Sequence, residues 1–390
     1  MMRVLGMISG TSHDGIDVAV VELQHAGDEL HGTILHHGST PYRPELRARL
    51  LAALPPAPTS LAEVCELDTL IGHAFADAAV AAAGAAGPAD LVVSHGQTVF
   101  HWVEANRALG TLQLGQPAWI AEAAGTPVLS DVRSRDIAAR GHGAPLVPLL
   151  DVLLLGGTDG VVAALNLGGI SNLTVIDDGV VRVAFDVGPA NALLDAVVVE
   201  RRANPLGYDE GGRLAASGQV DEGLLGALLD EPYYLLPPPK STGKELFHLG
   251  YVRAALARSG SDPSTPDLLA TLAELTVRTV AAAVRDSGAA VVMASGGGCH
   301  NPVLHERLAA AIAPARLTRS DEFGAPSDAK EALAFAVIGW CTWHGLPGNE
   351  PAATGASGPR VLGSLTPGHG PLVLPAPLAS PVRALRLTTR

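Results

Sequence analysis

Three glycine-rich segments carry the residue types that could do chemistry in this chain. The first, GTSHDGID, contains Gly10, Thr11, Ser12, His13, Asp14, Gly15 and Asp17. A glycine-rich turn can point several backbone N–H groups at one anion, and the hydroxyl groups here add further donors. The alternative is an ordinary hairpin turn in which Asp14 and Gly15 supply the positive φ angles. The segment is not a Walker P-loop, because GxxxxGK[ST] is absent and an apolar strand pattern follows it.

The other two segments have related chemistry. LNLGGISN contains Asn166, Gly168, Gly169, Ser171 and Asn172, again between two strand patterns. SGGGCHNP contains Gly296, Gly297, Gly298 and Asn301, after a strand and before a helix, where the backbone can approach a phosphate closely. The dinucleotide fingerprint GxGxxG is not met, since Asn301 stands at its sixth position. Each segment alone fits a plain turn, whereas the pair of strand–corner–strand segments favours a binding role.

Two carboxylates are candidates for acid–base chemistry. Asp186, in FDVGPAN, ends an alternating strand pattern, and a carboxylate at the C-terminal end of a strand often faces a ligand crevice. The alternative is a loop carboxylate that solvates the turn, with Asn191 as the N-cap of the next helix. Glu331, in SDAKEALAFA, lies three residues after Asp328, so this pair also fits a helix capping box. The residue types alone leave both alternatives open.

Polar side chains also gather in SHGQTVFH and in DVRSRDIAARGHGAP. They include His95, Gln97, Thr98, Arg133 and Asp136. His95 and His101 have no carboxylate or cysteine at ligand spacing, so we expect them to form hydrogen bonds and not a metal site. An arginine near a crevice is suited to clamp a carboxylate or a phosphate.

The elements that must position these residues form two similar series. Residues 3–10 and 15–23 fit the two strands of a hairpin, the second of which alternates with a period of two, and a third strand follows. Residues 60–84 fit a helix that opens with Ser60 as N-cap and Glu63 three residues on. From residue 160 the chain starts again with a strand, a glycine corner and a strand. We therefore expect an α/β protein with mixed sheets and a structural duplication.

The composition limits the class of protein. At 390 residues the chain exceeds the usual size of one hydrophobic core, so we expect two domains. A net charge of -13 argues against binding to nucleic acid or to an anionic membrane surface. Three scattered cysteines, no signal-peptide pattern and apolar runs shorter than about 20 residues predict a cytoplasmic protein without a membrane span. The stretch from about Leu346, dense in Gly and Pro, predicts a surface extension with a last strand in PLVLPAP.

Nine segments of the sequence together resemble the anhydro-N-acetylmuramic acid kinases, a family of the actin/hexokinase/Hsp70 ATPase superfamily. In chain order they are GMISGTSHDGID, SHGQTVFH, QLGQP, DVRSRDIAARGHGAPLVP, NLGGISN, FDVGPAN, STGKELF, SGGGCHNP and TGASGPRVLG, and they reach about Gly370. The resemblance implies two ribonuclease-H-like (actin-like ATPase) domains, with mixed sheets flanked by helices and with ATP and sugar in an interdomain cleft. Residues 1–130 would carry the first phosphate hairpin and part of the sugar site. Residues 131–370 would carry the second hairpin, the catalytic aspartate and the adenosine loop, and residues 371–390 form an extension.

The resemblance also implies a reaction. With ATP and Mg²⁺, water opens the ring of 1,6-anhydro-N-acetylmuramic acid while O6 is phosphorylated, which gives N-acetylmuramic acid 6-phosphate in peptidoglycan recycling. Asp186 would take the proton of the attacking water, and Glu331 would help to hold that water. Asp17 would steer Mg²⁺, and the three glycine-rich segments would contact the nucleotide. The sugar would be bound by His95, Gln97, Thr98, Arg133 and Asp136.

Four positions depart from the family pattern. Val187 and Ala190 stand where we expect Thr and Gly, Arg140 where a small residue is usual, and His13 where an apolar residue is frequent. These four departures concern the geometry of the loops and the affinity for the substrate. Two other functions stay open, namely a kinase of the same superfamily for another small sugar or carboxylate, and a nucleotide-gated interaction module like the actin and Hsp70 cores. The sequence is compatible with a homodimer and does not set the oligomeric state.

Overall fold

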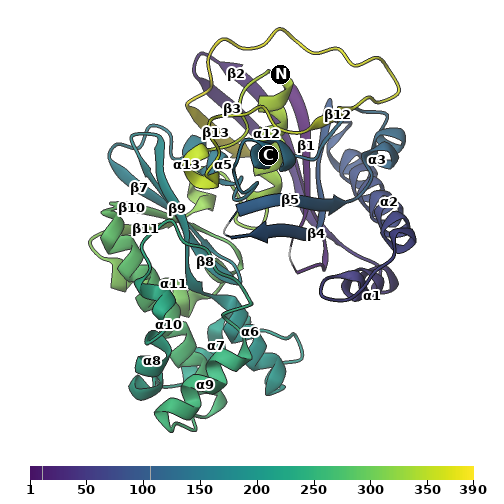
Figure 1. Ribbon diagram of the computed structural model, residues 1–390. Coiled ribbons are helices and arrows are strands. Elements are labelled where there is room, and N and C mark those ends of the chain that lie inside the picture. The colour runs from purple at the N-terminus through teal and green to yellow at the C-terminus, as the bar shows by residue number, and fades with distance from the viewer. Residues whose placement is uncertain (11, 106) are drawn as a thin grey trace. The chain divides into compact units, whose positions relative to one another are not determined.

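The computed structural model describes residues 1–390 with the exception of positions 11 and 106 (Figure 1). Thr11, a predicted nucleotide contact, is therefore outside the described residues. The chain divides into two units, one comprising Met1–Gly157 with Phe323–Arg390 and the other Thr158–Glu322. The first unit is discontinuous because the chain returns to it at Phe323. These divisions differ from the boundaries after residues 130 and 370 that the sequence predicted.

The first unit is built on one mixed sheet. Its strands are β1 (Met2–Ser9), β2 (Gly15–Ala26), β3 (Glu29–Pro41), β4 (Leu91–Glu104), β5 (Arg107–Leu114), β6 (Val128–Ser130), β12 (Ser364–Thr366) and β13 (Ala384–Thr389). Its helices are α1 (Pro44–Ala53), α2 (Leu61–Ala86), α3 (Pro117–Ala124), α4 (Ser134–Ala138), α5 (Pro148–Leu154), α12 (Lys330–Trp343) and α13 (Pro351–Thr354). The strands run in the order β12-β6-β4-β1-β2-β3-β13, and β5 pairs with β4 off this path.

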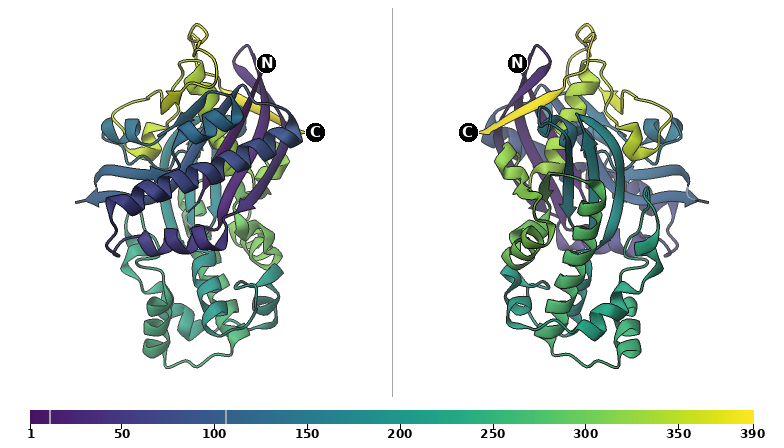
Figure 2. Two further views of the ribbon diagram at one scale, coloured as in Figure 1. Left: turned by 90° about the vertical axis from the view of Figure 1, so that its right-hand side faces the viewer. Right: turned by 90° about the vertical axis from the view of Figure 1, so that its left-hand side faces the viewer.

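Alternation along the strands decides which helix covers each face of this sheet. Leu5 and Met7 of β1 pack with Phe75 of α2 in one hydrophobic cluster, and Figure 2 shows α1 and α2 lying across the strands. Gly6 lies between them and faces the opposite side, because successive residues of a strand alternate. A β-carbon at Gly6 would lie 2.0 Å from the carbonyl oxygen of Ala332 in α12. Helix α12 can therefore approach the sheet this closely only because residue 6 is glycine.

The second unit is built on a smaller sheet, with helices that follow β9. Its strands are β7 (Val161–Leu167), β8 (Ile170–Asp177), β9 (Val180–Pro189), β10 (Val291–Ser295) and β11 (Arg316–Arg319), in the order β11-β10-β7-β8-β9. Its helices are α6 (Asn191–Glu200), α7 (Arg213–Ser217), α8 (Glu222–Leu229), α9 (Leu249–Ser259), α10 (Thr265–Ser287) and α11 (Pro302–Ile312). Short 3₁₀ turns are η1 (Glu210–Gly212), η2 (Pro232–Leu235) and η3 (Gly297–His300), and η4 (Ser320–Phe323) leads back to the first unit.

The two sheets share one topology. In the first unit β1–β2 and β2–β3 are antiparallel, whereas β1–β4 and β4–β6 are parallel. In the second unit β7–β8 and β8–β9 are antiparallel, whereas β7–β10 and β10–β11 are parallel. Numbered within its unit, the core of each sheet has the strand order 3-2-1-4-5, which is the ribonuclease-H-like arrangement. The predicted α/β fold with mixed sheets flanked by helices and a structural duplication is confirmed.

The starts of two helices test the predicted capping patterns. The Ser60 hydroxyl caps α2 as predicted, because it accepts a hydrogen bond from the Glu63 N–H at 3.1 Å. Helix α12, in contrast, begins after Ala329 as N-cap, and a methyl group cannot accept a hydrogen bond. The alternative in which Asp328 and Glu331 form a capping box is therefore wrong.

Helix α2 differs from the expectation that every apolar run is too short to span a membrane. By length and composition alone it is long and apolar enough to do so. Its Ile71, Phe75 and Ala79 pack in the hydrophobic cluster with the sheet. In the first unit α2 therefore has the place of a core helix.

The C-terminal segment also differs from the prediction. The segment PLVLPAP, residues 371–377, forms no strand; β13 forms further along the chain and pairs in parallel with the outer strand β3. Near it, a β-carbon at Gly156 would lie 2.3 Å from the carbonyl oxygen of Arg383, and one at Gly324 would lie 2.2 Å from that of Leu387. These two glycines stand beside the points where the chain leaves and re-enters the first unit.

Candidate active site

The corner between β1 and β2 runs from Gly10 to Asp14. The His13 N–H donates to the Gly10 carbonyl oxygen at 3.3 Å, and the Ser12 hydroxyl donates to Asp14 Oδ1 at 2.6 Å. Among the described residues of the corner, a positive φ angle of 54° belongs to His13, so the prediction that Asp14 and Gly15 supply it is wrong. Gly15 is required for a different reason, because a β-carbon there would lie 2.5 Å from a carbonyl oxygen of β3.

Two buried side chains hold this corner from the sheet. The Ser9 hydroxyl lies 2.7 Å from the Gly15 carbonyl oxygen and 2.7 Å from Gln97 Oε1. The Gln97 amide nitrogen donates to the Gly10 carbonyl oxygen at 3.2 Å. Because Gln97 is fully buried with its amide engaged, the geometry supports a role in fixing the corner more than a direct contact with sugar.

Asp17 lies just inside β2, opposite Ser39 of β3, which hydrogen-bonds to its carboxylate. Partial burial raises the pKa of Asp17, and the like charges of Asp14 and Asp328 raise it further. Carboxylates gathered in this way fit a divalent cation, which would offset their repulsion. Across the described residues no group of three or more His, Cys, Asp or Glu side chains is arranged to hold a metal by itself. A Mg²⁺ ion at Asp17 would therefore take most of its oxygen ligands from water and phosphate.

The buried His95 and the half-buried Arg133 form a hydrogen-bonded pair in the first unit. Arg133 Nε donates to His95 Nε2 at 2.7 Å, and His95 Nδ1 lies 2.9 Å from the carbonyl oxygen of Gly96. Burial and the Arg133 charge hold the pKa of His95 well below its usual range, so the imidazole is neutral with its proton on Nδ1. Burial lowers the pKa of Arg133 to about 10, which leaves the guanidinium charged at neutral pH. The imidazole thus orients a cation that can bind a polar or anionic ligand group.

Glu331 projects from the first turn of α12. Its side chain reaches solvent, yet the surrounding protein raises its pKa and the Asp17 carboxylate adds to that effect. The charges of Arg133 and Lys330 act in the opposite direction. The structure therefore brings Asp17, Arg133 and Glu331, which are far apart in the sequence, into one electrostatic cluster.

Asp136 is fully buried and accepts three hydrogen bonds. Its Oδ2 accepts from the Gly143 N–H at 2.8 Å, and its Oδ1 accepts from Asn349 Nδ2 at 2.6 Å and from the Thr354 hydroxyl at 2.7 Å. Gly143 also supplies the carbonyl oxygen to which Arg133 donates at 2.7 Å. The geometry thus supports a role in which Asp136 holds the loop that orients Arg133.

Three departures from the family pattern have a local explanation. Arg140 has a φ of 72°, in the left-handed region that favours glycine, which explains why a small residue is usual there. Val187 and Ala190 are 4% and 1% exposed, so they pack as core side chains beside Asp186.

In the second unit, Asp186 lies within β9, which continues to Pro189, and not at the end of the strand as predicted. Its Oδ2 accepts hydrogen bonds from the Ser241 hydroxyl at 2.9 Å and from the Thr242 N–H at 3.0 Å. Among the residues that the structure describes, none donates a hydrogen bond to Oδ1. Partial burial raises the pKa of Asp186, the two hydrogen bonds lower it, and the charge of Glu245 raises it.

The segment that carries Ser241 and Thr242 was quoted for the resemblance but had no predicted role. It is fixed to β9 by the Asp186 N–H, which donates to the Lys240 carbonyl oxygen at 3.0 Å. Tyr233 precedes this segment in the same connection, and its hydroxyl donates to the Asp186 carbonyl oxygen at 2.7 Å. The signal available in the sequence was the Ser-Thr-Gly triplet after a run of prolines, but no spacing rule connects it to Asp186.

The second and third glycine-rich segments meet in the second unit. A β-carbon at Gly296, which has a φ of 85°, would lie 2.4 Å from Asn166 Oδ1. One at Gly298 would lie 2.7 Å from the β-carbon of Leu167. Asn166 stands opposite Asn172 in the β7–β8 pairing. The two segments can contact each other only because these positions lack side chains.

Other predicted contacts in this unit also have partners within the protein. The carbonyl oxygens of Gly168 and Gly169 each accept from one of the first N–H groups of α6 at 3.0 Å, and that of Gly169 also accepts from the N-cap Ala190 N–H at 2.9 Å. The sequence predicted Asn191 as the N-cap of that helix, but Asn191 is its first residue and Ala190 is the N-cap. The Ser171 hydroxyl donates to a carbonyl oxygen of β9 at 3.0 Å, and Asn301 caps α11 at 3.1 Å. These side chains hold the corners in shape.

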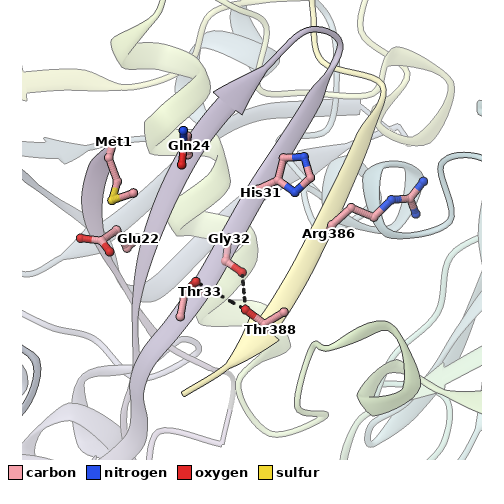
Figure 3. A pocket seen from close by; sticks show the side chains of 8 residues that line it. All are labelled: Met1, Glu22, Gln24, His31, Gly32, Thr33, Arg386 and Thr388. Carbon is pink, nitrogen blue, oxygen red and sulfur yellow. Dashed lines mark hydrogen bonds between the residues drawn. The ribbon is translucent and has the colours of Figure 1, made fainter.

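A hollow on the outer strands of the first unit lies apart from these residues (Figure 3). It has a volume of about 140 Å³ and is lined by Met1, Glu22, Gln24, His31, Gly32, Thr33, Arg386 and Thr388. Sites for small organic ligands usually measure about 300–1,000 Å³. Its lining contains none of the sequence-predicted site residues, so it has no part in the candidate active site.

Comparisons with known proteins agree with the resemblance. The sequence profile of the family described as anhydro-N-acetylmuramic acid kinase matches residues 2–368. The protein of that name from Streptomyces avermitilis is 58% identical over 386 residues, which cover 98% of this chain and 99% of that protein. The one from Synechococcus elongatus is 42% identical and covers 93% of this chain and 99% of that protein. Among solved structures, a ROK family glucokinase from Streptomyces griseus in complex with glucose and AMPPNP covers 87% of this chain and 99% of its own, at 14% identity and a TM-score of 0.37. By its profile match and its relatives, the chain belongs to the anhydro-N-acetylmuramic acid kinase family.

Proposed function

We propose that this chain transfers the γ-phosphoryl group of ATP to O6 of 1,6-anhydro-N-acetylmuramic acid while water opens the anhydro ring. The product is N-acetylmuramic acid 6-phosphate, as expected for an enzyme of peptidoglycan recycling. The observation that carries the proposal is the Asp186 carboxylate, which has one oxygen held by Ser241 and Thr242 and the other open to a ligand. Family membership supports this kinase function over a nucleotide-gated interaction module.

Asp186 acts as the general base in this reaction. O6 of the anhydro sugar is part of the ring and carries no hydrogen, so the proton that the base removes must come from water. The water oxygen attacks the anomeric carbon, its proton passes to Oδ1 of Asp186, and the bond between the anomeric carbon and O6 breaks. O6 bonds to the γ-phosphorus, and ADP leaves with the electron pair of the broken P–O bond. Partial burial makes the carboxylate a stronger base, and such help is worth about 10²–10⁴-fold in rate.

Residues of the first unit support the reaction through binding and orientation. Glu331 holds the attacking water as a hydrogen-bond acceptor. Arg133, oriented by His95, clamps the lactyl carboxylate of the sugar, because a guanidinium group matches the geometry of a carboxylate. Gln97 and Asp136 keep the surrounding backbone in place.

The glycine-rich corners contact the nucleotide. Residues 10–15 and 166–172 face its phosphates with backbone N–H groups, and residues 296–301 lie toward the adenosine. Because backbone groups supply the donors, no Walker lysine is needed. Asp17 would hold Mg²⁺, which when bound neutralises charge on the transferred phosphoryl group.

We also propose that the enzyme works in the cytoplasm on small molecules alone. The net charge of -13 supports the absence of a nucleic-acid or anionic-membrane partner, because both attract basic surfaces. A homodimer is compatible with this function, and sedimentation of the purified protein measures the oligomeric state directly.

The test is mass spectrometry of the product formed from the anhydro sugar, ATP and Mg²⁺ in ¹⁸O-labelled water. We expect the label in the anomeric hydroxyl and the phosphate on O6. Asp186→Asn keeps the shape of the side chain but removes the base, so turnover should fall by about 10²-fold or more while thermal unfolding is unchanged. Near-wild-type turnover by this variant would exclude Asp186 as the base, and an unlabelled product would exclude ring opening by water.

A further inference from the structure

A buried ion pair lies at the start of α12, one residue before Glu331. Lys330 Nζ lies 2.6 Å from Asp151 Oδ1 of α5, and the two side chains are 4% and 6% exposed. Burial raises the pKa of Asp151, and the charge of Lys330 opposes that effect. A buried pair adds little net stability compared with apolar side chains of similar volume. Stability alone therefore does not explain why these two charges are inside the protein.

The pair connects the first turns of two helices. Asp151 lies in the first turn of α5, where the helix dipole favours an anion. Lys330 is the first residue of α12, where the dipole disfavours a cation. The carboxylate offsets that unfavourable interaction and anchors the backbone from which Glu331 projects. The two helices also pack against each other within the first unit.

Charged groups from several elements act on Glu331. Asp17 of β2 raises its pKa, whereas Arg133, which precedes α4, and Lys330 of α12 itself lower it. Two more carboxylates act on Asp17, namely those of Asp14 and Asp328. Glu331 thus belongs to a cluster rich in negative charge, and Lys330 is one of two cations that offset this charge at its carboxylate.

We propose that the Lys330–Asp151 pair is a positioning device for Glu331, which fixes the start of α12 and sets the charge state of that carboxylate. The inference rests on the proposed function, because the charge of Glu331 matters only if the carboxylate accepts a hydrogen bond from the attacking water. Loss of the cation disfavours the ionised form, so that a larger share of Glu331 is protonated in mild acid. The pair thereby extends the working range of the site toward lower pH.

The test is the dependence of kcat/KM on pH, measured on the full chain with the anhydro sugar, ATP and Mg²⁺. We expect Lys330→Met to move the acidic limb to higher pH by about half a unit or more, because one of two nearby cations is lost. Lys330→Arg keeps a cation and should leave the limb in place. Arg49→Met is the matched control, because it removes an ion-paired cation on α1 in the same unit.

A second variant keeps the test decisive if Lys330→Met does not fold. Lys330→Met combined with Asp151→Asn removes both charges at similar volume, and the same shift of the acidic limb is expected. An unmoved limb in a folded and active variant would overturn the inference, and so would an equal shift with Arg49→Met. If the wild-type chain fails to phosphorylate the anhydro sugar, the proposed function fails and the inference with it, so the two failures are distinguishable.

Discussion

At the scale of single residues, Asp186 shows how neighbours that are remote in sequence set the proton affinity of a carboxylate. Ser241 and Thr242 both donate to Oδ2 and favour the ionised carboxylate. Partial burial and the charge of Glu245 oppose this effect and raise the pKa of Asp186. The proton affinity of the base is therefore a balance between dehydration and two hydrogen bonds.

This balance predicts the effect of Ser241→Ala. The substitution removes a hydrogen bond that favours the charged form, so the pKa of Asp186 rises. As the pH falls, the carboxylate is then protonated at a higher pH and no longer acts as a base. The acidic limb of kcat/KM should therefore move to higher pH by as much as about one unit. The pH profile measures this shift directly.

Ser217→Ala is the control for that experiment. Ser217 is the last residue of α7 in the same unit, and its hydroxyl donates to the Leu214 carbonyl oxygen and not to Asp186. Its pH profile should match that of the wild type. A wild-type profile for Ser241→Ala as well would contradict the expectation that this hydroxyl lowers the pKa of a base that limits kcat/KM in acid.

The sequence predicted which residue types gather at the site, but not how each one is used. Gln97 and Asp136 were expected to bind the sugar, whereas the structure buries both with their polar atoms engaged. Burial depends on which strands and loops pack together, and polar residue types do not report it. Ser241 was missed because its contact with Asp186 joins residues 55 positions apart.

At the scale of elements, the contact between α12 and β1 depends on one missing side chain. A β-carbon at Gly6 would lie 2.0 Å from the carbonyl oxygen of Ala332 and 2.6 Å from the backbone nitrogen of Ala336. Both atoms belong to the helix backbone and cannot move without the helix. Because Glu331 projects from the first turn of α12, this packing also helps to place the site.

We therefore expect Gly6→Ala to displace α12 and to lower the free energy of unfolding by about 2 kcal/mol or more. Urea-induced unfolding measures this change. Gly226→Ala in α8 is the matched control, because nothing lies within 4 Å of the added β-carbon and alanine is the better helix former. That control should raise stability by as much as about 1 kcal/mol. Equal stability of Gly6→Ala and the wild type would mean that α12 can shift without cost.

The sequence predicted helices and strands correctly where residues close together in the chain determine them. The hairpin of β1 and β2 and the cap at Ser60 were predicted correctly, because hairpin pairing and capping involve neighbours in the chain. The strand expected in residues 371–377 was wrong, and β13 forms at Ala384–Thr389. Its pairing with β3 joins opposite ends of the chain, and such pairing leaves no mark in a local pattern.

At the scale of the whole molecule, two units with one strand order account for the repeated strand–corner–strand segments of the sequence. The first unit adds β13 to the outer edge of its sheet, beside β3. Leu385 of this strand is 1% exposed, and the strand passes close to Gly156 and Gly324. The last residues of the chain thus cover an edge that would otherwise present unpaired backbone groups.

Deletion of residues 383–390 should therefore lower the thermal stability of the protein and promote self-association through the uncovered edge of β3. Thermal unfolding and light scattering at several protein concentrations measure the two effects. Removal of Arg390 alone leaves β13 complete and is the control. A truncated chain that stays as stable and as monodisperse as this control would contradict the expectation.

The position of β13 at the very end of the chain sets a schedule for biosynthesis. The second unit, Thr158–Glu322, is complete in the nascent polypeptide well before the first, whose α12 and β13 are made afterwards. β1, β2 and β3 emerge from the ribosome early, yet the outer edge of β3 stays open until residues 384–389 have been made and can pair with it. A ribosome that stalls before residue 384 therefore yields a nascent chain whose open strand edge is a template for aggregation, and synthesis of β13 is the event that covers this edge.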